Sequence, residues 1–219
     1  VVDKEDRLVG IITVDDAMDV MEAEATEDIE KMAAMLPTDK PYLKTSVFET
    51  FKSRIPWLLL LMVSATFTGQ IIAKFEDALG ACAILTAYIP MLMDTGGNCG
   101  SQSSTLIIRG LALSEIHFKD IFKVIFKEFR ISIIVGGVLA LTNGIRILIQ
   151  YHNPSLAFVI ALSLTATVII SKLIGCILPL LASKVHLDPA IMASPLITTL
   201  VDTFSILIYF NIATLMFHL

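Results

Sequence analysis

The sequence from residue 78 to residue 108 reads ALGACAILTAYIPMLMDTGGNCGSQSSTLII, thirty-one residues with a single charged side chain, Asp94. Stretches this apolar are typical of membrane-spanning helices, which need about 20 residues to cross the hydrocarbon core. The carboxylate, amides and hydroxyls in its second half are costly to bury in lipid, and such groups normally face a cavity or a substrate path. The stretch therefore predicts a membrane protein with a polar route inside it.

The composition of the whole chain also indicates a membrane protein. Of the 219 residues, 55% are hydrophobic, and the mean hydropathy is +0.78, which is too apolar for an ordinary soluble domain. Residues 1–54 contain 13 of the 21 acidic and 7 of the 16 basic residues, whereas residues 55–219 are nearly neutral. We expect an acidic head on a neutral membrane body, with no nucleic-acid partner.

Five stretches are long and apolar enough to cross a bilayer. They lie at residues 55–75, within 78–108, at 131–151, within 155–183 and at 189–217. The predicted fold is an all-α membrane protein with five transmembrane helices per subunit. Pro56 and Trp57 fit the start of the first span, and the glycine-rich middle of the second predicts a break or kink.

The distribution of Lys and Arg predicts the orientation of these spans. Nine basic residues flank the spans on one side, whereas the other side receives only Lys74 and Arg146. By the positive-inside rule the N-terminus is cytoplasmic, and five crossings place the C-terminus outside the cell membrane. Lys172 falls within the fourth stretch, and we expect it to extend toward an interface or a cavity.

Residues 116–129, between the second and third spans, have one apolar and one lysine-rich helical face. This pattern fits a helix that lies on the anionic lipid of the inner leaflet. A plain cytoplasmic extension of the third transmembrane helix explains it nearly as well. The apolar positions are Ile121, Phe122, Ile125, Phe126 and Phe129, and the basic ones are Lys119, Lys123 and Lys127.

The run from Asp94 to Thr105 has the chemistry to hold a hydrated cation. Its glycines allow close approach of the backbone, and an interrupted helix would leave carbonyl oxygens free. Neutral oxygens can hold the water shell of Mg²⁺, which dehydrates reluctantly, weakly enough for the ion to move on. Helix packing is the simpler explanation for Ser103, Ser104 and Gly110. It does not call for the acid or the amide. The neutral oxygens come from Asn98, Ser101, Gln102 and Thr105.

The last apolar stretch contains a second isolated acid, Asp202. Asp188 and Pro189 fit the N-cap and first position of its helix, and Pro195 is expected to free a carbonyl just before a cluster of hydroxyls. A fixed negative charge at mid-span attracts divalent cations, and a symmetric dimer would bring two such charges to one axis. The alternative is a neutral Asp202 that is hydrogen-bonded to a neighbour.

Two patterns that suggest other chemistry have simpler explanations. Asp94-Thr95-Gly96 spells the active-site triplet of aspartic proteases, but no glycine follows Asp202 and the Gly-x-Gly-Asp pattern of intramembrane proteases is absent. We therefore expect no enzyme. The three cysteines lie in apolar sequence and cannot form a closed disulfide set, so we interpret them as packing residues. They are Cys82, Cys99 and Cys176.

The acidic head combines a short apolar run with an acidic helix. Residues 8–13 predict a strand, and from Val14 to Met35 apolar residues recur at helical spacing. An acidic helical face is usually just solvated. Like charges four residues apart, however, repel by about 0.2–0.5 kcal/mol per pair, and a divalent cation would relieve that repulsion. Solvation and metal sensing both stay open.

Three blocks, in this order, resemble the MgtE family of magnesium channels. They are residues 10–28, residues 90–109, and residues 188–190 with 195–202. The resemblance covers essentially the whole chain. It implies a homodimer with five spans per subunit, a pore on the dimer axis, and a cytoplasmic part made of an N domain, paired CBS domains and a plug helix.

The resemblance also implies a division of the chain. Residues 1–23 would be the C-terminal fragment of a CBS domain, residues 24–54 the plug helix and its link, and residues 55–219 the channel domain. We expect the chain to be the C-terminal part of a longer protein, because it begins in the middle of such a domain. Thr13 and Asp16 also fit the nucleotide-contacting pattern of CBS domains, but the sequence does not tell whether ATP binds.

Individual residues acquire roles from the same resemblance. Asp202 would be the central pore acid that holds a hydrated Mg²⁺, although some family members carry Gly at position 94 and Asn at position 101. High cytosolic Mg²⁺ would close the pore by bridging the head to the plug helix. The remaining pore residues are Asp94, Gly97, Asn98, Ser101 and Thr105, and the regulatory acids are Asp16, Glu24, Glu27 and Asp28.

The hypothesis is therefore a dimeric Mg²⁺ channel of the inner membrane, gated by intracellular Mg²⁺, with Mg²⁺ as both transported and regulatory ion. An ion-coupled secondary transporter of Mg²⁺, Co²⁺ or Mn²⁺ is the alternative, and an intramembrane hydrolase is the third hypothesis. The sequence does not rank Mg²⁺ against Mn²⁺, Co²⁺ or Ca²⁺, because recognition of a hydration shell depends on fine geometry.

Overall fold

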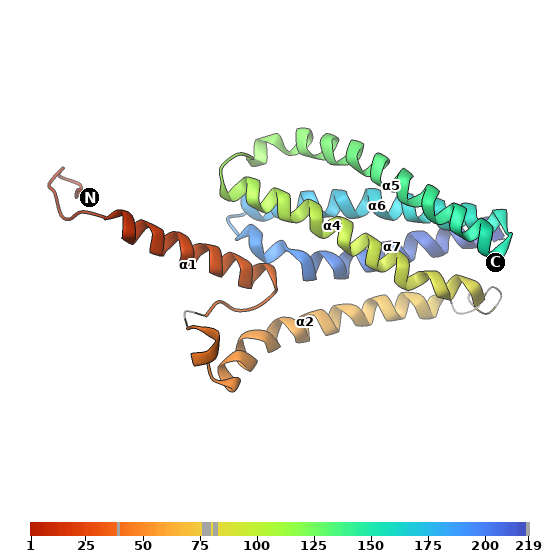
Figure 1. Ribbon diagram of the computed structural model, residues 1–219, viewed down its shortest axis with the longest axis horizontal. Helices are drawn as coiled ribbons and strands as arrows, with labels where there is room; N and C mark the ends of the chain where they lie inside the picture. Colours follow the sequence, from red (N-terminus) through yellow and green to blue (C-terminus); the bar gives the residue numbers. More distant parts are fainter. Residues whose placement is uncertain (39, 76–79, 81–82, 218–219) are drawn as a thin grey trace.

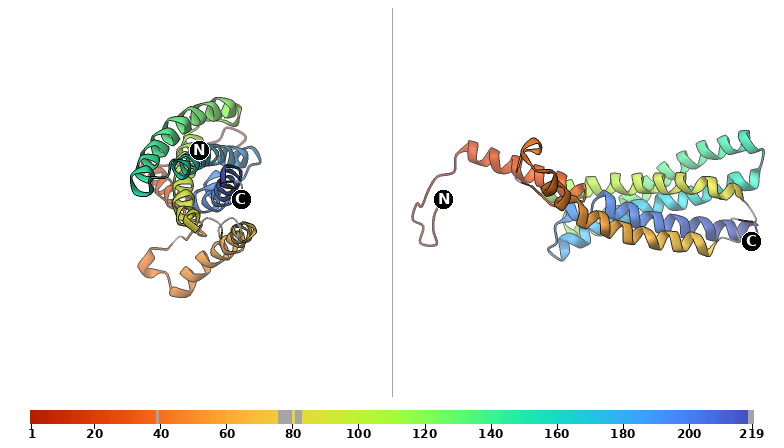
Figure 2. Two further views of the ribbon diagram at one scale, coloured as in Figure 1. Left: turned by 90° about the vertical axis from the view of Figure 1, so that its right-hand side faces the viewer. Right: turned by 90° about the horizontal axis from the view of Figure 1, so that it is seen from below.

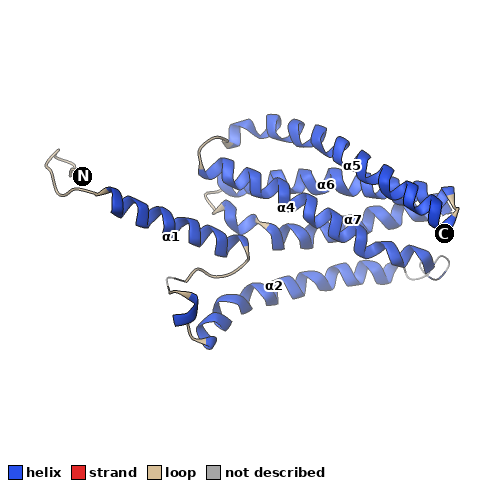
Figure 3. Cartoon of the chain, viewed as in Figure 1, coloured by secondary structure: helices blue, strands red, loops and turns tan. Residues whose placement is uncertain are grey.

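The computed structural model describes residues 1–38, 40–75, 80 and 83–217, and this part of the chain is almost entirely helical (Figure 3). The six α-helices are α1 (Val14–Met32), α2 (Val47–Lys74), α4 (Ile89–Ala112), α5 (Ile121–Tyr151), α6 (Pro154–Lys184) and α7 (Ser194–Phe217). Short 3₁₀ turns are η1 (Tyr42–Lys44), η2 (Ala83–Tyr88), η3 (Phe118–Asp120) and η4 (Pro189–Met192). The prediction of an all-α protein is confirmed for the described residues.

The strand predicted at residues 8–13 is wrong. Before α1 the chain forms only an isolated bridge between Val2 and Leu8, and residues 8–13 have no second strand to pair with in the described part of the molecule. Because a strand needs a partner for its backbone hydrogen bonds, the apolar pattern alone cannot fix one here. The helix predicted to follow is present as α1, and Thr13 caps it.

Helices α4, α5, α6 and α7 form an elongated bundle, and α2 lies along one side of it (Figure 1, Figure 2). Helix α6 packs against α4, α5 and α7, whereas α2 packs chiefly against α7. Accordingly α6 has the most buried side chains, and α2 buries only Thr68. Helix α1 projects from the end of the bundle at which α4 finishes and α7 begins.

Four helical segments are long and apolar enough to cross a membrane, by length and composition. They are Val47–Lys74, Phe118–Tyr151, Pro154–Lys184 and Pro189–Phe217 in the described chain. Helix α4 lies among them with 24 residues, a length of about 36 Å at 1.5 Å per residue. Its polar residues lower its hydropathy, so a membrane crossing by α4, which would bring the number of spans to five, stays a prediction.

One predicted helix start is wrong, and a second is confirmed but belongs to a shorter helix. Helix α2 begins at a capping box made by Ser46 and Glu49, which places Pro56 inside the helix and not at its first turn. Asp188 does cap a helix, because its side chain accepts a hydrogen bond from the backbone N–H of Ala190, but that helix is the short η4. Pro195 is then the second residue of α7, where a backbone N–H has no partner within the helix, so Pro195 does not free a carbonyl of that helix as expected.

The predicted break in the glycine-rich helix is also wrong, because α4 is continuous from Ile89 to Ala112. Its glycines permit close packing instead. A Cβ atom on Gly96 would lie 2.8 Å from Val201 of α7, and one on Gly100 would lie 2.7 Å from Ile197. A Cβ atom on Gly175 of α6 would overlap the backbone carbonyl of Gly100, so α4 and α6 touch backbone to backbone.

The segment that precedes the third span is an extension of that helix and not a separate surface helix. Helix α5 runs without interruption from Ile121 through Tyr151. Val124 and Glu128 face the bundle, whereas Phe122 and Phe126 are 81% and 63% exposed. The expected division into an apolar and a basic face is therefore only partly realised.

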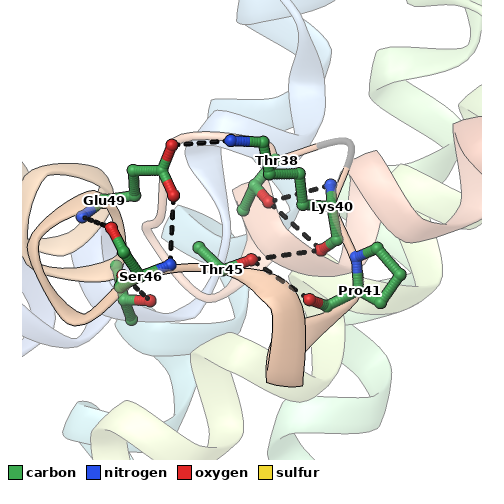
Figure 4. Close-up of polar contacts among 7 residues, drawn as sticks. Thr38, Lys40, Pro41, Thr45, Ser46 and Glu49 are labelled. Carbon is green, nitrogen blue, oxygen red and sulfur yellow. Dashed lines mark hydrogen bonds and ion pairs between the residues drawn. The ribbon is translucent and has the colours of Figure 1, made fainter.

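The linker between α1 and α2 is closed by local polar contacts (Figure 4). Lys40 Nζ lies 2.6 Å from Glu49 Oε1, and the Thr45 hydroxyl donates to the carbonyl of Pro41 at 3.2 Å. The backbone N–H of Leu36 donates to the carbonyl of Ser53 of α2 at 2.9 Å. These contacts tie the end of α1 to the start of the first candidate span.

Candidate cation site

Helix α4 has one polar face and one tightly packed face. Asp94, Asn98, Ser101 and Thr105 follow the 4-3-4 spacing that places residues on one side of a helix. Asp94, Asn98 and Thr105 are exposed, and Ser101 is partly exposed. The polar face lines an open hollow of about 710 Å³, which is bordered by Asn98, Ser101, Gln102, Thr105 and Leu106.

The opposite face of α4 is buried against α6, α7 and η4. Ser103 and Ser104 are each 1% exposed, which fits the packing role expected for them. The Ser104 hydroxyl donates to the carbonyl of Met192 at 3.3 Å, and a Cβ atom on Gly110 would meet Ile116. The small residues fix which way α4 is turned, so its polar side faces outward from the subunit.

Asp202 of α7 is half-buried beside this polar face. A Cβ atom on Gly97 would lie 2.9 Å from Thr198, which is one turn before Asp202. Because α4 and α7 run in opposite directions (Figure 1), Asp94, one turn before Gly97, approaches Asp202, and the two carboxylates interact electrostatically. The structure thus brings together Asp94, Gly97 and Asp202, which include both acids at the centre of the sequence prediction.

The other predicted pore residues extend from this centre along α4. Asn98, Ser101 and Thr105 lie progressively closer to the end of the bundle that carries α1. Within the described ranges, no three His, Cys, Asp or Glu side chains converge as a metal-binding group. The arrangement is therefore an open line of oxygens with two acids at one end, which suits an ion that keeps its water shell.

Hydroxyls near Asp202 are used within the protein. Thr198 and Thr199 both donate to the carbonyl of Pro195, at 3.0 and 2.9 Å. Thr203 donates to the carbonyl of Thr199, and its hydroxyl lies 3.0 Å from that of Thr68 on α2. This contact is a polar link between α2 and the helix that carries the acid.

The four predicted regulatory acids lie on α1 but do not gather at one point. Asp16 is part of the helix cap, and its carboxylate accepts from the Thr13 hydroxyl at 2.6 Å and from the Thr13 N–H at 2.8 Å. These two hydrogen bonds lower the pKa of Asp16. Twelve residues of helix, about 18 Å, separate Asp16 from Asp28, whereas Glu24 and Glu27 are close enough to Asp28 to repel its charge.

The C-terminal end of α1 is joined by an ion pair to the loop between α6 and α7. Lys31 Nζ lies 2.6 Å from Asp188 Oδ2 and also pairs with Glu27. Partial burial, and then the negative charge of Asp188, raise the pKa of Asp28. Met32 completes the junction by packing against Ile108, Ala190 and Ala193. The sequence does not predict this junction, since nothing in its pattern pairs a helix end with residue 188.

A buried charge cluster was also missed. Lys172 of α6 does not extend to an interface, as the sequence analysis expected, because Glu128 of α5 lies opposite it in the bundle. Lys172 Nζ donates to the Ser103 hydroxyl at 3.2 Å, and that hydroxyl donates to Glu128 Oε2 at 2.7 Å. The Lys172 and Glu128 side chains are 6% and 7% exposed and their charged atoms are 3.7 Å apart. The burial of Glu128 could have been inferred from its position, four residues from the apolar Val124 on the same helical face.

Cys99 and Cys176 are buried free thiols, which agrees with the packing role expected of them. Cys82 lies outside the described residues. No interpretation as a disulfide is needed for the two described cysteines.

A bundle with four helices long enough to cross a membrane is the architecture of a multi-pass membrane protein. The helix α4 between them carries an exposed polar face that includes a carboxylate. Residues 89–212 match the family model of MgtE, described as a divalent cation transporter. The chain belongs to the MgtE family. Members of this kind are transporters and not enzymes.

Three curated relatives, each named magnesium transporter MgtE, align with nearly the whole chain. Identity is 44% over 218 residues with the Bacillus subtilis protein, covering 100% of this chain and 48% of the relative. It is 40% over 216 residues with the Thermus thermophilus protein, covering 99% and 48%, and 34% over 215 residues with the Enterococcus faecalis protein, covering 98% and 47%. The chain spans about half the length of these relatives.

Proposed function

We propose that this chain is the membrane part of a Mg²⁺ channel, in which α4 and α7 line the ion path. The observation that carries the proposal is the outward-facing polar side of α4. A carboxylate, an amide and hydroxyls exposed at membrane depth are too costly to leave in lipid. Such a face is stable only against water or against a second polar surface, and a path for hydrated ions on a dimer axis supplies both.

Asp202 and Asp94 are the groups that attract the ion. Two carboxylates that already repel each other gain most when a divalent cation lies between or beside them. The oxygens of Asn98, Ser101 and Thr105 then hold the water shell of the ion as it moves along α4. Neutral acceptors bind that shell weakly, which lets the ion leave. Manganese, cobalt and calcium ions compete at this site only as far as their water shells fit it.

The outward-facing polar side of α4 also supports a homodimer, in which this side of one subunit would face that of the other. Helix α4 is the second of the five spans in chain order. Five crossings place the N-terminus in the cytoplasm and the C-terminus outside the inner membrane, and residues 55–219 form the channel domain. Residues 1–23 belong to a CBS domain, and residues 24–54 are the plug helix and its link. The exposed apolar positions of α1, among them Met18 at 62% and Met21 at 71%, support a covering partner for that helix.

Gating by cytosolic Mg²⁺ uses Glu24, Glu27 and Asp28, with Asp16 as part of the head. The repulsion between Asp28 and Asp188 supports a regulatory role, since a divalent cation bound there would draw α1 toward the loop that begins α7. The site needs further ligands, because these acids form no closed group in the described chain.

An ion-coupled secondary transporter is the alternative mechanism, and the buried Lys172–Glu128 pair is the feature that favours it, because charged pairs within membrane bundles mark proton relays in transporters. Flux measured with and without imposed H⁺ and Na⁺ gradients separates the two. A channel follows the Mg²⁺ driving force alone, whereas a coupled transporter requires one of the other gradients.

The experiment that tests the site is Mg²⁺ uptake into liposomes by the Asp202→Ala protein. We expect uptake to fall by at least about tenfold, equivalent to about 1.4 kcal/mol of lost attraction for the ion, while the dimer remains intact on size-exclusion chromatography with light scattering. The control is Thr214→Val, on α7 but distant along the helix from Asp202. Uptake at the wild-type rate by the Asp202→Ala protein would refute the assignment of the pore acid.

A further inference from the structure

A second polar hollow lies at the end of the bundle remote from α1, between η2, the first turn of α4 and the last turns of α5. It has a volume of about 470 Å³ and is lined by Ala87, Tyr88, Met91, Asn143, Arg146 and Tyr151. It shares no residue with the hollow along Asn98 and Thr105. It is therefore separate from the proposed ion path.

The chemistry of this second hollow is that of hydrogen-bond donors. Arg146 donates through Nε to Asn143 Oδ1 at 3.0 Å, and its guanidinium carbon lies 5.9 Å from the centre of the Tyr88 ring. Asn143 Oδ1 is thus engaged by Arg146, whereas Asn143 Nδ2 is buried and has no hydrogen-bond partner. A buried donor without an acceptor raises the free energy of the protein, so a hydrogen-bond acceptor beside Asn143 would be stabilising.

The charge of the hollow is positive. The ion pairs within the described part of the chain all involve other residues, so Arg146 has no carboxylate partner there. A guanidinium at this place repels Mg²⁺, which excludes a role in holding the transported cation. Its planar set of donors matches the oxygens of a phosphate group.

We propose that this hollow binds a phosphate group, and specifically the headgroup phosphate of an anionic phospholipid. The planar donors of Arg146 hold the phosphate oxygens, and Asn143, whose Oδ1 accepts from Arg146 Nε, orients the guanidinium. The buried Tyr88 and the exposed Tyr151 also line the hollow, and tyrosine rings are favoured at the membrane surface. Met91 and Ala87 give the glycerol and upper acyl chain an apolar wall. This is a lipid site that the ion-transport proposal neither requires nor predicts.

The test is native mass spectrometry of the purified protein with phosphatidylglycerol added in steps, compared with phosphatidylcholine. We expect the wild-type protein to retain phosphatidylglycerol preferentially, and the Arg146→Gln protein to bind it about tenfold more weakly, because one charge-assisted pair is lost. The matched control is Lys74→Gln, which removes the other basic residue predicted on the same side. It should leave binding within about twofold of wild type.

A second variant separates recognition of phosphate from general attraction of charge. Arg146→Lys keeps the positive charge but loses the planar set of donors, and we expect it to bind several-fold more weakly than wild type. Inorganic phosphate, added as a competitor, identifies the source of the anion. If it displaces the lipid at millimolar concentration, the hollow is a phosphate site that free phosphate fills, and the lipid assignment is overturned.

Two results would overturn the proposal as a whole. One is unchanged phosphatidylglycerol retention by the Arg146→Gln protein. The other is an equal loss in the Arg146→Gln and Lys74→Gln proteins, which would mean that diffuse surface charge holds the lipid. Mg²⁺ uptake by the Arg146→Gln protein in phosphatidylcholine liposomes is measured in parallel. Normal uptake together with lost lipid retention supports the lipid site and leaves the ion path unaffected.

Discussion

Lys172, Glu128 and Ser103 join three helices through one chain of contacts, and their energetics are those of a buried ion pair. Removing one partner leaves an uncompensated charge, which costs about 3–5 kcal/mol. Replacing both by apolar residues of similar size is often neutral, because the desolvation penalty of both charges disappears. Removing one member of the pair therefore lowers the stability of the protein far more than replacing both members does.

We predict that Lys172→Met and Glu128→Leu each destabilise the protein by about 3–5 kcal/mol and that the double variant recovers most of the loss. Thermal unfolding in detergent, followed by circular dichroism, measures this. Lys184→Met is the control, since Lys184 is exposed and lies over the Phe118 ring. A double variant with the summed loss of the two singles would show that the pair is not coupled.

The two acids of the candidate site are predictable from the sequence, whereas the partner of the buried lysine is not. Asp94 and Asp202 stand out because isolated charges in apolar sequence are rare, and the structure brings them together. Lys172 was misplaced because a single lysine in a span carries no information about which helix faces it. Its partner, Glu128, lies in a segment rich in lysine, where an acid looks like ordinary surface charge.

At the scale of elements, the contact between α1 and η4 responds to protonation. Burial, and then the nearby carboxylate of Asp188, raise the pKa of Asp28, and Glu24 and Glu27 add to the effect while Lys31 opposes it. A raised pKa means that docking of α1 is favoured at low pH, where Asp28 is neutral. That contribution is lost as the pH rises from the unfolded value of about 3.9 through the raised pKa.

We predict that in Mg²⁺-free buffer the docking of α1 on η4 weakens as the pH rises from about 4 toward neutrality, without being lost because Lys31 still pairs with Asp188, and that Mg²⁺ strengthens docking at pH 7. Spin labels at Ala23→Cys and Leu187→Cys report the separation by electron–electron resonance. In the Asp28→Asn protein the separation should stay short across this range. Glu22→Gln, on the solvated side of α1, is the control. A pH response that survives Asp28→Asn would assign the effect to another group.

Element boundaries were predictable where the chain has strong apolar periodicity or a cap, as for α1 and α6. The continuity of α4 was not, because Gly96, Gly97 and Gly100 break an isolated helix as readily as they let two helices approach. Only the positions of α6 and α7 decide between these outcomes. In this bundle they contact the glycines directly, and packing holds the helix together.

A single subunit leaves several surfaces uncovered in the described part of the chain, and two of them bear on the proposed dimer. One is the polar side of α4, and the other is most of α2, whose exposed side chains include Leu58 and Met62. A dimer that faces α4 with α4 would cover the first and surround the ion path with two copies of Asp202. The sequence pointed to this arrangement only through its resemblance to the family, since composition does not specify symmetry.

We predict that Thr105→Cys, in a background without other cysteines, is crosslinked to a second copy by a short bis-maleimide in native membranes. Val138→Cys on α5 is the control, since Val138 is 60% exposed on a helix that we expect to face lipid. Crosslinked dimers are read on denaturing gels. Equal yields at the two positions, or none at Thr105→Cys, would contradict the proposed dimer axis.

The backbone contact between Gly100 and Gly175 limits how the path can open. With no side chain between them, α4 and α6 have no soft layer on which to slide, and any separation would expose bare peptide groups at the centre of the membrane. We therefore expect α4 and α6 to keep a fixed position relative to each other. In the proposed gating, we therefore expect the motion to involve the loop that pairs with Lys31 and the start of α7, so that a displacement of α1 reaches the helix that carries Asp202.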